Sequence, residues 1–226
     1  MRLRFVPMKS FPSLAALAAL FLPCFAGSAA AQQGGPEASA SSSVDYAKAI
    51  APRPREPWEG NEVDFETGAI WRITNSTPID YVVLPQMLTF KGPMIYLFDW
   101  GDEGDKLVVR SRLSFLGEYF LEGPETYFFG FHGSPSIEWW NAERDLSVFY
   151  SVGGGIGFLD STAVEGGHGQ DFNFTWFMHL GLRHRLAEGF YFQYGAYFQH
   201  TSNRGLNERN PGLNALGPMV GLSWEW

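Results

Sequence analysis

The sequence predicts an all-β protein whose fold is an eight-stranded antiparallel up-and-down transmembrane β-barrel. From residue 80 onward, apolar and polar residues alternate in segments that turn-forming stretches separate. Aromatic residues make up 16% of the chain and glycine occurs 26 times, a composition typical of barrels with aromatic girdles and closely packed strands. No stretch after residue 31 approaches the roughly 20 unbroken apolar residues of a transmembrane helix. The sequence therefore favours a barrel over a helical membrane protein.

The N-terminal residues predict a secretory signal peptide over residues 1–31. Basic residues come first, namely Arg2, Arg4 and Lys9. An apolar stretch over residues 14–26 follows, and small residues precede the cleavage site that we expect near Ala31. The single cysteine, Cys24, lies inside this segment, so the mature chain should contain none. This excludes the small secreted domains that disulfides hold together.

Residues 32–64 predict a flexible periplasmic linker, because they are rich in Ala, Ser, Gly, Pro and Glu and show little apolar periodicity. The part after Trp58 could fold against a barrel, and we expect the barrel itself over residues 65–226. The whole chain has 24 acidic and 16 basic residues and a net charge of −8. This charge excludes nucleic-acid binding through a generally basic surface.

Eight strands are expected in order along the chain. They are Asp80–Phe90, Pro93–Trp100, Leu107–Leu121, Tyr127–Trp140, Asp145–Leu159, Phe172–Leu186, Phe190–Ser202 and Leu213–Trp226. The first two are the least regular, and the last four alternate strictly between large apolar residues and Gly, Gln, Ser, Arg or His. Short turns at 141–145 and 187–189 and longer loops at 160–170 and 203–212 separate these four. This rhythm predicts an up-and-down barrel with alternately short and long connections.

The same alternation would also fit a soluble barrel that keeps its apolar residues inside. Two features favour the membrane. Large aromatic side chains share one face while Gly, Gln, Arg and His share the other, which suits a polar lumen. The chain also ends on Trp226, an aromatic end typical of outer-membrane barrels. We therefore expect a location in the bacterial outer membrane.

His200 and Ser202 stand at the end of the seventh expected strand, on its lipid-facing side. If the last strand ends in the periplasm, residues 203–212 form an outer loop and both side chains lie at the outer rim. Their Cα atoms should be about 6.6 Å apart, because a strand rises about 3.3 Å per residue. A histidine at this spacing can take the proton of a serine hydroxyl and make it a nucleophile. The chain offers no competing Gly-x-Ser-x-Gly elbow.

Asn214 is the expected third member of this group, since strand parity puts it on the same face of the next strand. Its amide oxygen can accept the imidazole Nδ1–H if it points that way. In the opposite orientation an amide holds the wrong tautomer, which lowers the turnover of a serine protease by about 10⁴. Glu208, in the expected outer loop, is a possible substitute acid.

The segments His200-Thr-Ser202-Asn203 and Asn210-Pro-Gly212-Leu-Asn214 resemble the signature of the outer-membrane lipid A 3-O-deacylases and the wider bacterial acyloxyacyl hydrolase-like family. The resemblance implies an eight-stranded barrel that carries a His, Ser and Glu triad on its outer wall and removes a fatty acyl chain from lipid A. It implies that Ser202 is the nucleophile and His200 the base. The loop residues Asn203, Asn210 and Gly212 match too, with Asn210 the better candidate for the oxyanion hole. Asn214 stands where the family has its acid.

The sequence thus predicts a serine ester hydrolase that acts on lipid A, or lipopolysaccharide, in the outer leaflet. It needs no cofactor, and the histidines show no spacing that favours a metal ion. Asp160, Glu165 and Asp171 in one outer loop could bind a divalent cation, but loop acids are more commonly solvated. Two alternatives stay open. One is a non-catalytic structural barrel that has lost its acid, since polar residues commonly mark a barrel rim. The other is a phospholipase-like specificity on the same scaffold.

Overall fold

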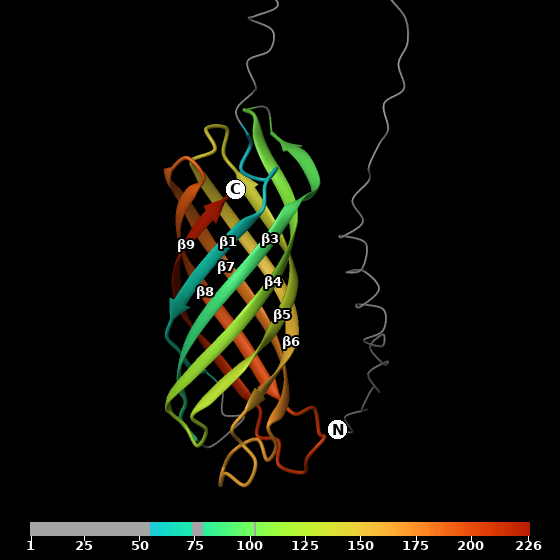
Figure 1. Cartoon of the computed structure of the whole chain (residues 1–226), viewed down its shortest axis with the longest axis vertical. Coiled ribbons are helices and arrows are strands. Elements are labelled where there is room, and N and C mark those ends of the chain that lie inside the picture. The colour runs from blue at the N-terminus through green and yellow to red at the C-terminus, as the bar shows by residue number, and fades with distance from the viewer. Residues whose placement is uncertain (1–54, 74–78, 102) are drawn as a thin grey trace, which may run out of the picture. The chain divides into compact units, whose positions relative to one another are not determined.

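The computed structural model describes residues 55–73, 79–101 and 103–226, and within them nine strands form one antiparallel sheet. The strands are β1 (Glu62–Gly68), β2 (Ile70–Arg72), β3 (Val82–Trp100), β4 (Asp105–Glu122), β5 (Tyr127–Trp140), β6 (Leu146–Leu159), β7 (Phe172–Ala187), β8 (Phe190–Ser202) and β9 (Leu213–Glu225). Each strand from β3 to β9 pairs with its neighbour in the chain, and β9 returns to β1 and β2, so the sheet closes (Figure 1).

Strands β1 and β2 occupy a single position in the ring. Both pair with β3 on one side and with β9 on the other, with a break at Ala69 between them. Glycine permits the close approach at this break, because a Cβ at Gly217 would lie 1.9 Å from the carbonyl oxygen of Ala69. The ring therefore has eight positions, and the prediction of an eight-stranded antiparallel barrel is confirmed.

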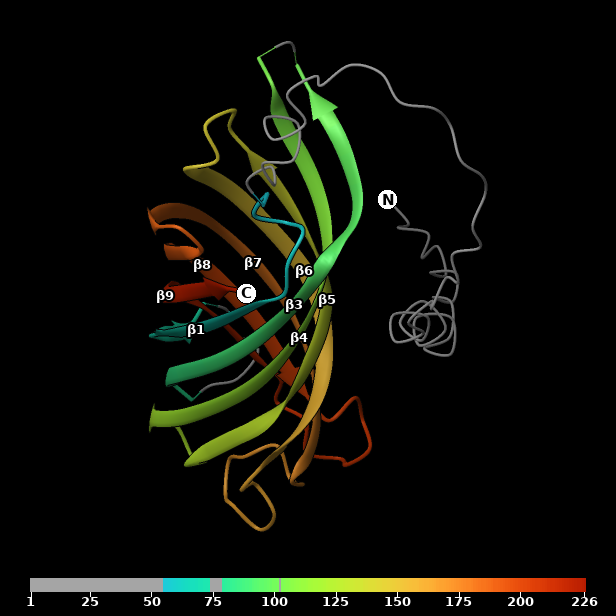
Figure 2. The same cartoon turned by 45° about the horizontal axis from the view of Figure 1, so that its top comes forward.

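The prediction for the first two strands was wrong in detail. Residues 82–90 of the first expected strand and all of Pro93–Trp100 belong to one strand, β3, which continues through an irregular register between Lys91 and Met94. Pro93 cannot donate a ladder hydrogen bond, but an irregular register tolerates this loss without ending the strand. β3 and β4 also run past their neighbours and curl outward (Figure 2).

The strand that the sequence did not predict begins in the predicted linker and continues into the predicted barrel region. Residues 62–64 open β1, and Trp58 is 1% exposed against Trp140, with their ring centroids 6.0 Å apart. β1 escaped prediction because it is short: its seven residues put acids on the lumen face and only Val63 and Phe65 as apolar residues on the outer face. The predicted signal peptide and the linker up to residue 54 lie outside the described residues.

The connections divide the barrel into two ends. Residues 79–81, 123–126, 160–171 and 203–212 lie at one end, called here the loop end. The short turns at 141–145 and 188–189 lie at the other end, called here the turn end, together with the end of β9. No helix in the described part of the chain is long and apolar enough to cross a membrane.

The two faces of the last four strands, β6 to β9, are those that the alternation predicted. In β8, Phe192 and Tyr194 are 37% and 40% exposed, whereas Gln193 and Gln199 are 1% and 3% exposed. Apolar side chains thus cover the outside and polar side chains line the inside, the arrangement of a transmembrane barrel. The lumen is not wholly polar, however, because an apolar cluster that includes Phe177 fills the part nearer the loop end.

A buried ion cluster holds β1 to the rest of the barrel. Glu62 contacts Lys91 at 2.8 Å, Arg110 at 2.6 Å and Arg183 at 3.1 Å, and all these side chains are at most 1% exposed. Arg183 also lies 3.7 Å from Glu138. Five positions of the ring therefore meet in a buried interior, where a charge needs its partners.

Removal of Glu62 should destabilise the barrel strongly. The Glu62→Ala variant leaves Lys91, Arg110 and Arg183 short of one negative charge, which we expect to cost about 3–5 kcal/mol. Urea unfolding in detergent micelles, followed by heat-modifiable gel mobility, measures the change. Glu103→Ala is the matched control, since Glu103 is exposed at the turn end. An unchanged unfolding midpoint in Glu62→Ala would contradict a stabilising role for the cluster.

Candidate active site

His200 and Ser202 end β8 on the outer face of the barrel, at the loop end. Both are half-buried, and Thr201 between them points into the lumen with 3% exposure. The register puts His200 between Trp176 of β7 and Asn214 of β9. The outward face of these three strands therefore carries the residues that the sequence singled out.

Asn214 orients the imidazole of His200. The distance from His200 Nδ1 to Asn214 Oδ1 is 2.8 Å, and an amide oxygen can only accept a hydrogen bond. Nδ1 is therefore the protonated nitrogen, and Nε2 is left as the basic one. This is the productive orientation of the two that the sequence left open.

Two further contacts confine the imidazole. The ring of Trp176 lies 6.1 Å from that of His200, at an interplanar angle of 34°. On the loop side, a Cβ added at Gly212 would lie 3.5 Å from His200 Cε1, and the positive φ of 64° favours glycine at this position. Gly212 thus lets the loop run closely past the ring.

Ser202 follows His200 by two residues on the same face of β8. Among the described residues, the Ser202 hydroxyl forms no hydrogen bond with the His200 imidazole. Ser202 pairs in register with Phe174. The imidazole is therefore held by Asn214, and the Ser202 hydroxyl lies on the same strand face without a bond to it. Catalytic hydrogen bonds of this kind often tighten only when substrate is bound.

Asn203, next to Ser202, is fully buried and holds the loop. Its Nδ2 donates to the carbonyl oxygens of His168 at 2.7 Å and Arg209 at 2.6 Å, and its Oδ1 accepts from the amide of Gly205 at 2.8 Å. Both amide hydrogens are used in this way. The side chain of Asn203 therefore stabilises the loops and has no N–H donor left for a substrate.

Asn210 has the complementary arrangement. Its Oδ1 accepts the backbone N–H of Asn203 at 3.0 Å, which fixes the amide plane beside the end of β8. The side chain is exposed, and its Nδ2 donates to no residue in the described part of the chain. Asn210 thus presents a free N–H donor beside Asn203, the residue that follows Ser202.

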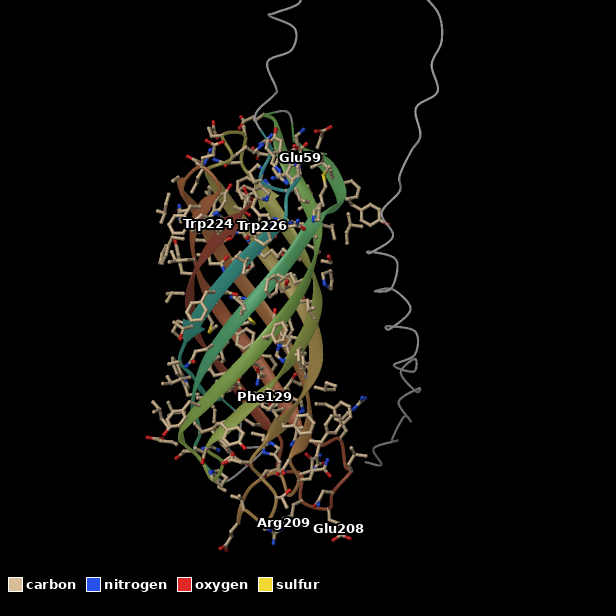
Figure 3. All side chains as sticks on the ribbon, in the orientation of Figure 1. Glu59, Phe129, Glu208, Arg209, Trp224 and Trp226 are labelled. Carbon is tan, nitrogen blue, oxygen red and sulfur yellow. The ribbon has the colours of Figure 1, made fainter. Side chains whose placement is uncertain are left out.

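Glu208 does not join the group. It is exposed at the tip of the loop, where Figure 3 shows it pointing away from the barrel beside Arg209. It forms no hydrogen bond or ion pair within the described residues, and Asn214 already occupies Nδ1 of His200. The geometry therefore gives no support to Glu208 as a substitute acid.

Sequence reasoning missed a second polar cluster at the loop end, centred on Glu125. This carboxylate accepts hydrogen bonds from Tyr81, Ser161 and His168. Burial raises the pKa of Glu125, but hydrogen bonds and positive charge from His168 outweigh this and lower it to about 2. Its partners come from distant parts of the chain, so no local sequence pattern marks the cluster.

The described residues contain no group of three or more His, Cys, Asp or Glu arranged to hold a metal ion.

The comparison with known families decides where this barrel belongs. The family model of the lipid A 3-O-deacylase (PagL) matches residues 93–223, more than half of the chain. The chain belongs to this family. The family match includes His200, Ser202 and Asn214, and it excludes β1 and β2.

A comparison with curated proteins found no match. Among solved structures, the crystal structure of the outer membrane enzyme PagL is similar, at 18% sequence identity and a TM-score of 0.49. The similarity covers 72% of this chain and 98% of that chain. Membership of the PagL family supports lipid A deacylation at the outer membrane as the general activity.

Proposed function

We propose that this protein is a serine ester hydrolase that removes an acyl chain from lipid A by the 3-O-deacylase reaction, in the outer leaflet of the bacterial outer membrane. Ser202 is the nucleophile, His200 the base and Asn214 the residue that orients the base. The observation that carries the proposal is the 2.8 Å hydrogen bond from His200 Nδ1 to Asn214 Oδ1, on the outer wall beside Ser202. Family membership supports the substrate class.

The reaction follows from this geometry as two acyl transfers. Ser202 Oγ attacks the ester carbonyl while Nε2 of His200 takes the hydroxyl proton. The oxyanion is stabilised by the exposed Nδ2 of Asn210, together with backbone N–H groups of the loop. The C–O bond to the sugar then breaks, and His200 returns its proton to the sugar oxygen. Water, deprotonated by the same histidine, releases the fatty acid from Ser202.

The outward position suits a substrate that stays in the membrane. The ester of lipid A lies near the boundary between sugars and acyl chains, and the site lies at the loop end of an apolar wall. Trp176 and Phe198 pack with ring centroids 4.8 Å apart next to His200, and Trp176 is 43% exposed. The acyl chain can therefore lie against these rings without leaving the leaflet.

Mass spectrometry of lipid A from a Gram-negative host tests the proposal. We expect loss of one acyl chain in cells that produce the wild-type protein and an intact pattern in cells that produce Ser202→Ala. Gel mobility must show that both barrels are folded. Equal lipid A patterns in the two strains would count against the deacylase. Loss of acyl chains from phospholipids instead would indicate a phospholipase, and no change in either lipid would indicate a structural barrel, which the neutral Asn214 also permits.

Asn210→Asp isolates the oxyanion donor. Aspartate keeps the oxygen that accepts from Asn203 N–H, but it replaces the free donor with a second oxygen. We expect kcat to fall by about 10²–10³, the usual effect of losing one oxyanion-hole donor, while the folded fraction is unchanged. Acyl release from lipid A in mixed micelles provides the measurement. A kcat equal to that of wild type would remove Asn210 from the mechanism.

A further inference from the structure

The connections at the loop end converge on one buried carboxylate. Glu125, in the turn between β4 and β5, is 3% exposed. Its Oε1 lies 2.9 Å from each of Ser161 Oγ, His168 N and His168 Nδ1, and its Oε2 accepts from Tyr81 Oη at 3.0 Å. Two segments of the chain, residues 79–81 and loop 160–171, therefore donate to a single acceptor in a third segment.

The space around this carboxylate is tightly filled. A Cβ added at Gly167 would lie 2.8 Å from Glu125 Oε1 and 2.5 Å from Ser161 Oγ. Only glycine leaves room for the hydrogen bonds as they stand. A buried carboxylate is costly unless its donors are in place, and hydrogen bonds to a charged acceptor are stronger than neutral ones. The low pKa of Glu125 keeps it ionised at neutral pH.

The cluster connects to the loop that follows Ser202. His168 is 1% exposed, and its carbonyl oxygen accepts from Asn203 Nδ2 at 2.7 Å. The backbone N–H of Asn203 in turn donates to Asn210 Oδ1 at 3.0 Å. A continuous chain of hydrogen bonds thus runs from Glu125 through His168 and Asn203 to Asn210.

We propose that Glu125 and His168 are positioning residues for the oxyanion hole. They hold loop 203–212 against loop 160–171, so that the amide of Asn210 stays at the position of the developing oxyanion beside Ser202. This inference rests on the proposed function. A donor that is misplaced by about 1 Å can cost about 10²-fold in rate, and a fully satisfied polar network is what keeps it in place.

Glu125→Gln, in the full chain, tests the inference. Glutamine keeps the size of the side chain but has one acceptor oxygen instead of two and lacks the negative charge. We expect kcat on lipid A in mixed micelles to fall about 10²-fold per folded molecule, with KM within about twofold of wild type. Glu165→Gln is the matched control, since Glu165 is an exposed acid of loop 160–171. A folded Glu125→Gln with unchanged kcat would overturn the inference.

Two substitutions of His168 separate positioning from folding. Asparagine can put a donor close to the place of Nδ1, whereas valine cannot, and both retain the backbone bonds to Glu125 and Asn203. We expect His168→Val to show the low kcat and His168→Asn to restore most of it. Equal kcat values in the two variants, per folded molecule, would refute a role for the Nδ1 bond.

The outcomes also separate this inference from the proposed function. A wild-type rate no higher than that of Ser202→Ala would refute the hydrolase itself. An active wild type whose kcat is insensitive to both Glu125→Gln and His168→Val would refute the positioning role alone. Loss of the folded form in Glu125→Gln leaves the decision to the pair of His168 variants.

Discussion

Ser202→Ala is expected to reduce the rate of lipid A deacylation at least about 10²-fold. In a serine protease, removal of the nucleophile costs about 2 × 10⁶ and removal of the acid alone about 3 × 10⁴, so a triad without its acid retains about 10² for the nucleophile to contribute. The amide of Asn214 holds the productive tautomer of His200, which should make the fall larger. Acyl release by the purified protein in mixed micelles measures it.

The same assay includes its own controls. Because Ser202 and His200 act as one unit, His200→Ala and the double variant should be as slow as Ser202→Ala and no slower. Ser147→Ala removes a buried hydroxyl that has no hydrogen-bond partner among the described residues, so it should retain the wild-type rate. A Ser202→Ala protein as active as Ser147→Ala would show that another residue is the nucleophile.

Asn214→Asp should raise kcat by about 10²–10⁴, because a carboxylate stabilises the imidazolium that forms in each acyl transfer and an amide does not. Aspartate has the length of asparagine, so its Oδ1 can occupy the same position, 2.8 Å from His200 Nδ1. Asn214→Glu introduces the acid that the sequence resemblance implies at this position, but glutamate needs a different rotamer. The kcat of each variant is compared with wild type under identical micelle conditions.

Asn61→Asp is the control for added charge, since Asn61 is exposed at the turn end and far from His200 along the strands. An increase in Asn214→Asp alone would identify the missing acid as the limit on the wild-type rate. If the wild type is active and neither Asn214 variant is faster, a step other than proton transfer limits turnover. No measurable acyl release by the wild type or by either acid variant would favour the structural barrel.

The strand faces could be predicted because alternation is a local property. Phe192 and Tyr194 face outward and Gln193 faces the lumen as the two-residue period required. The prediction failed where local signals were misleading. β1 alternates over only seven residues, and the partners of its buried Glu62, namely Lys91, Arg110 and Arg183, belong to three other strands, so the local signal is too short to mark it as a strand.

By itself, the sequence determined the barrel class, the inward and outward faces and the common face of His200, Ser202 and Asn214, because strand parity and short connections decide these features locally. Only the tertiary structure decided which way the Asn214 amide points, that the side chain of Asn203 is used within the loop, and that Glu125 meets His168. Those contacts join segments far apart in the chain. They depend on register and ring closure, which no single strand encodes.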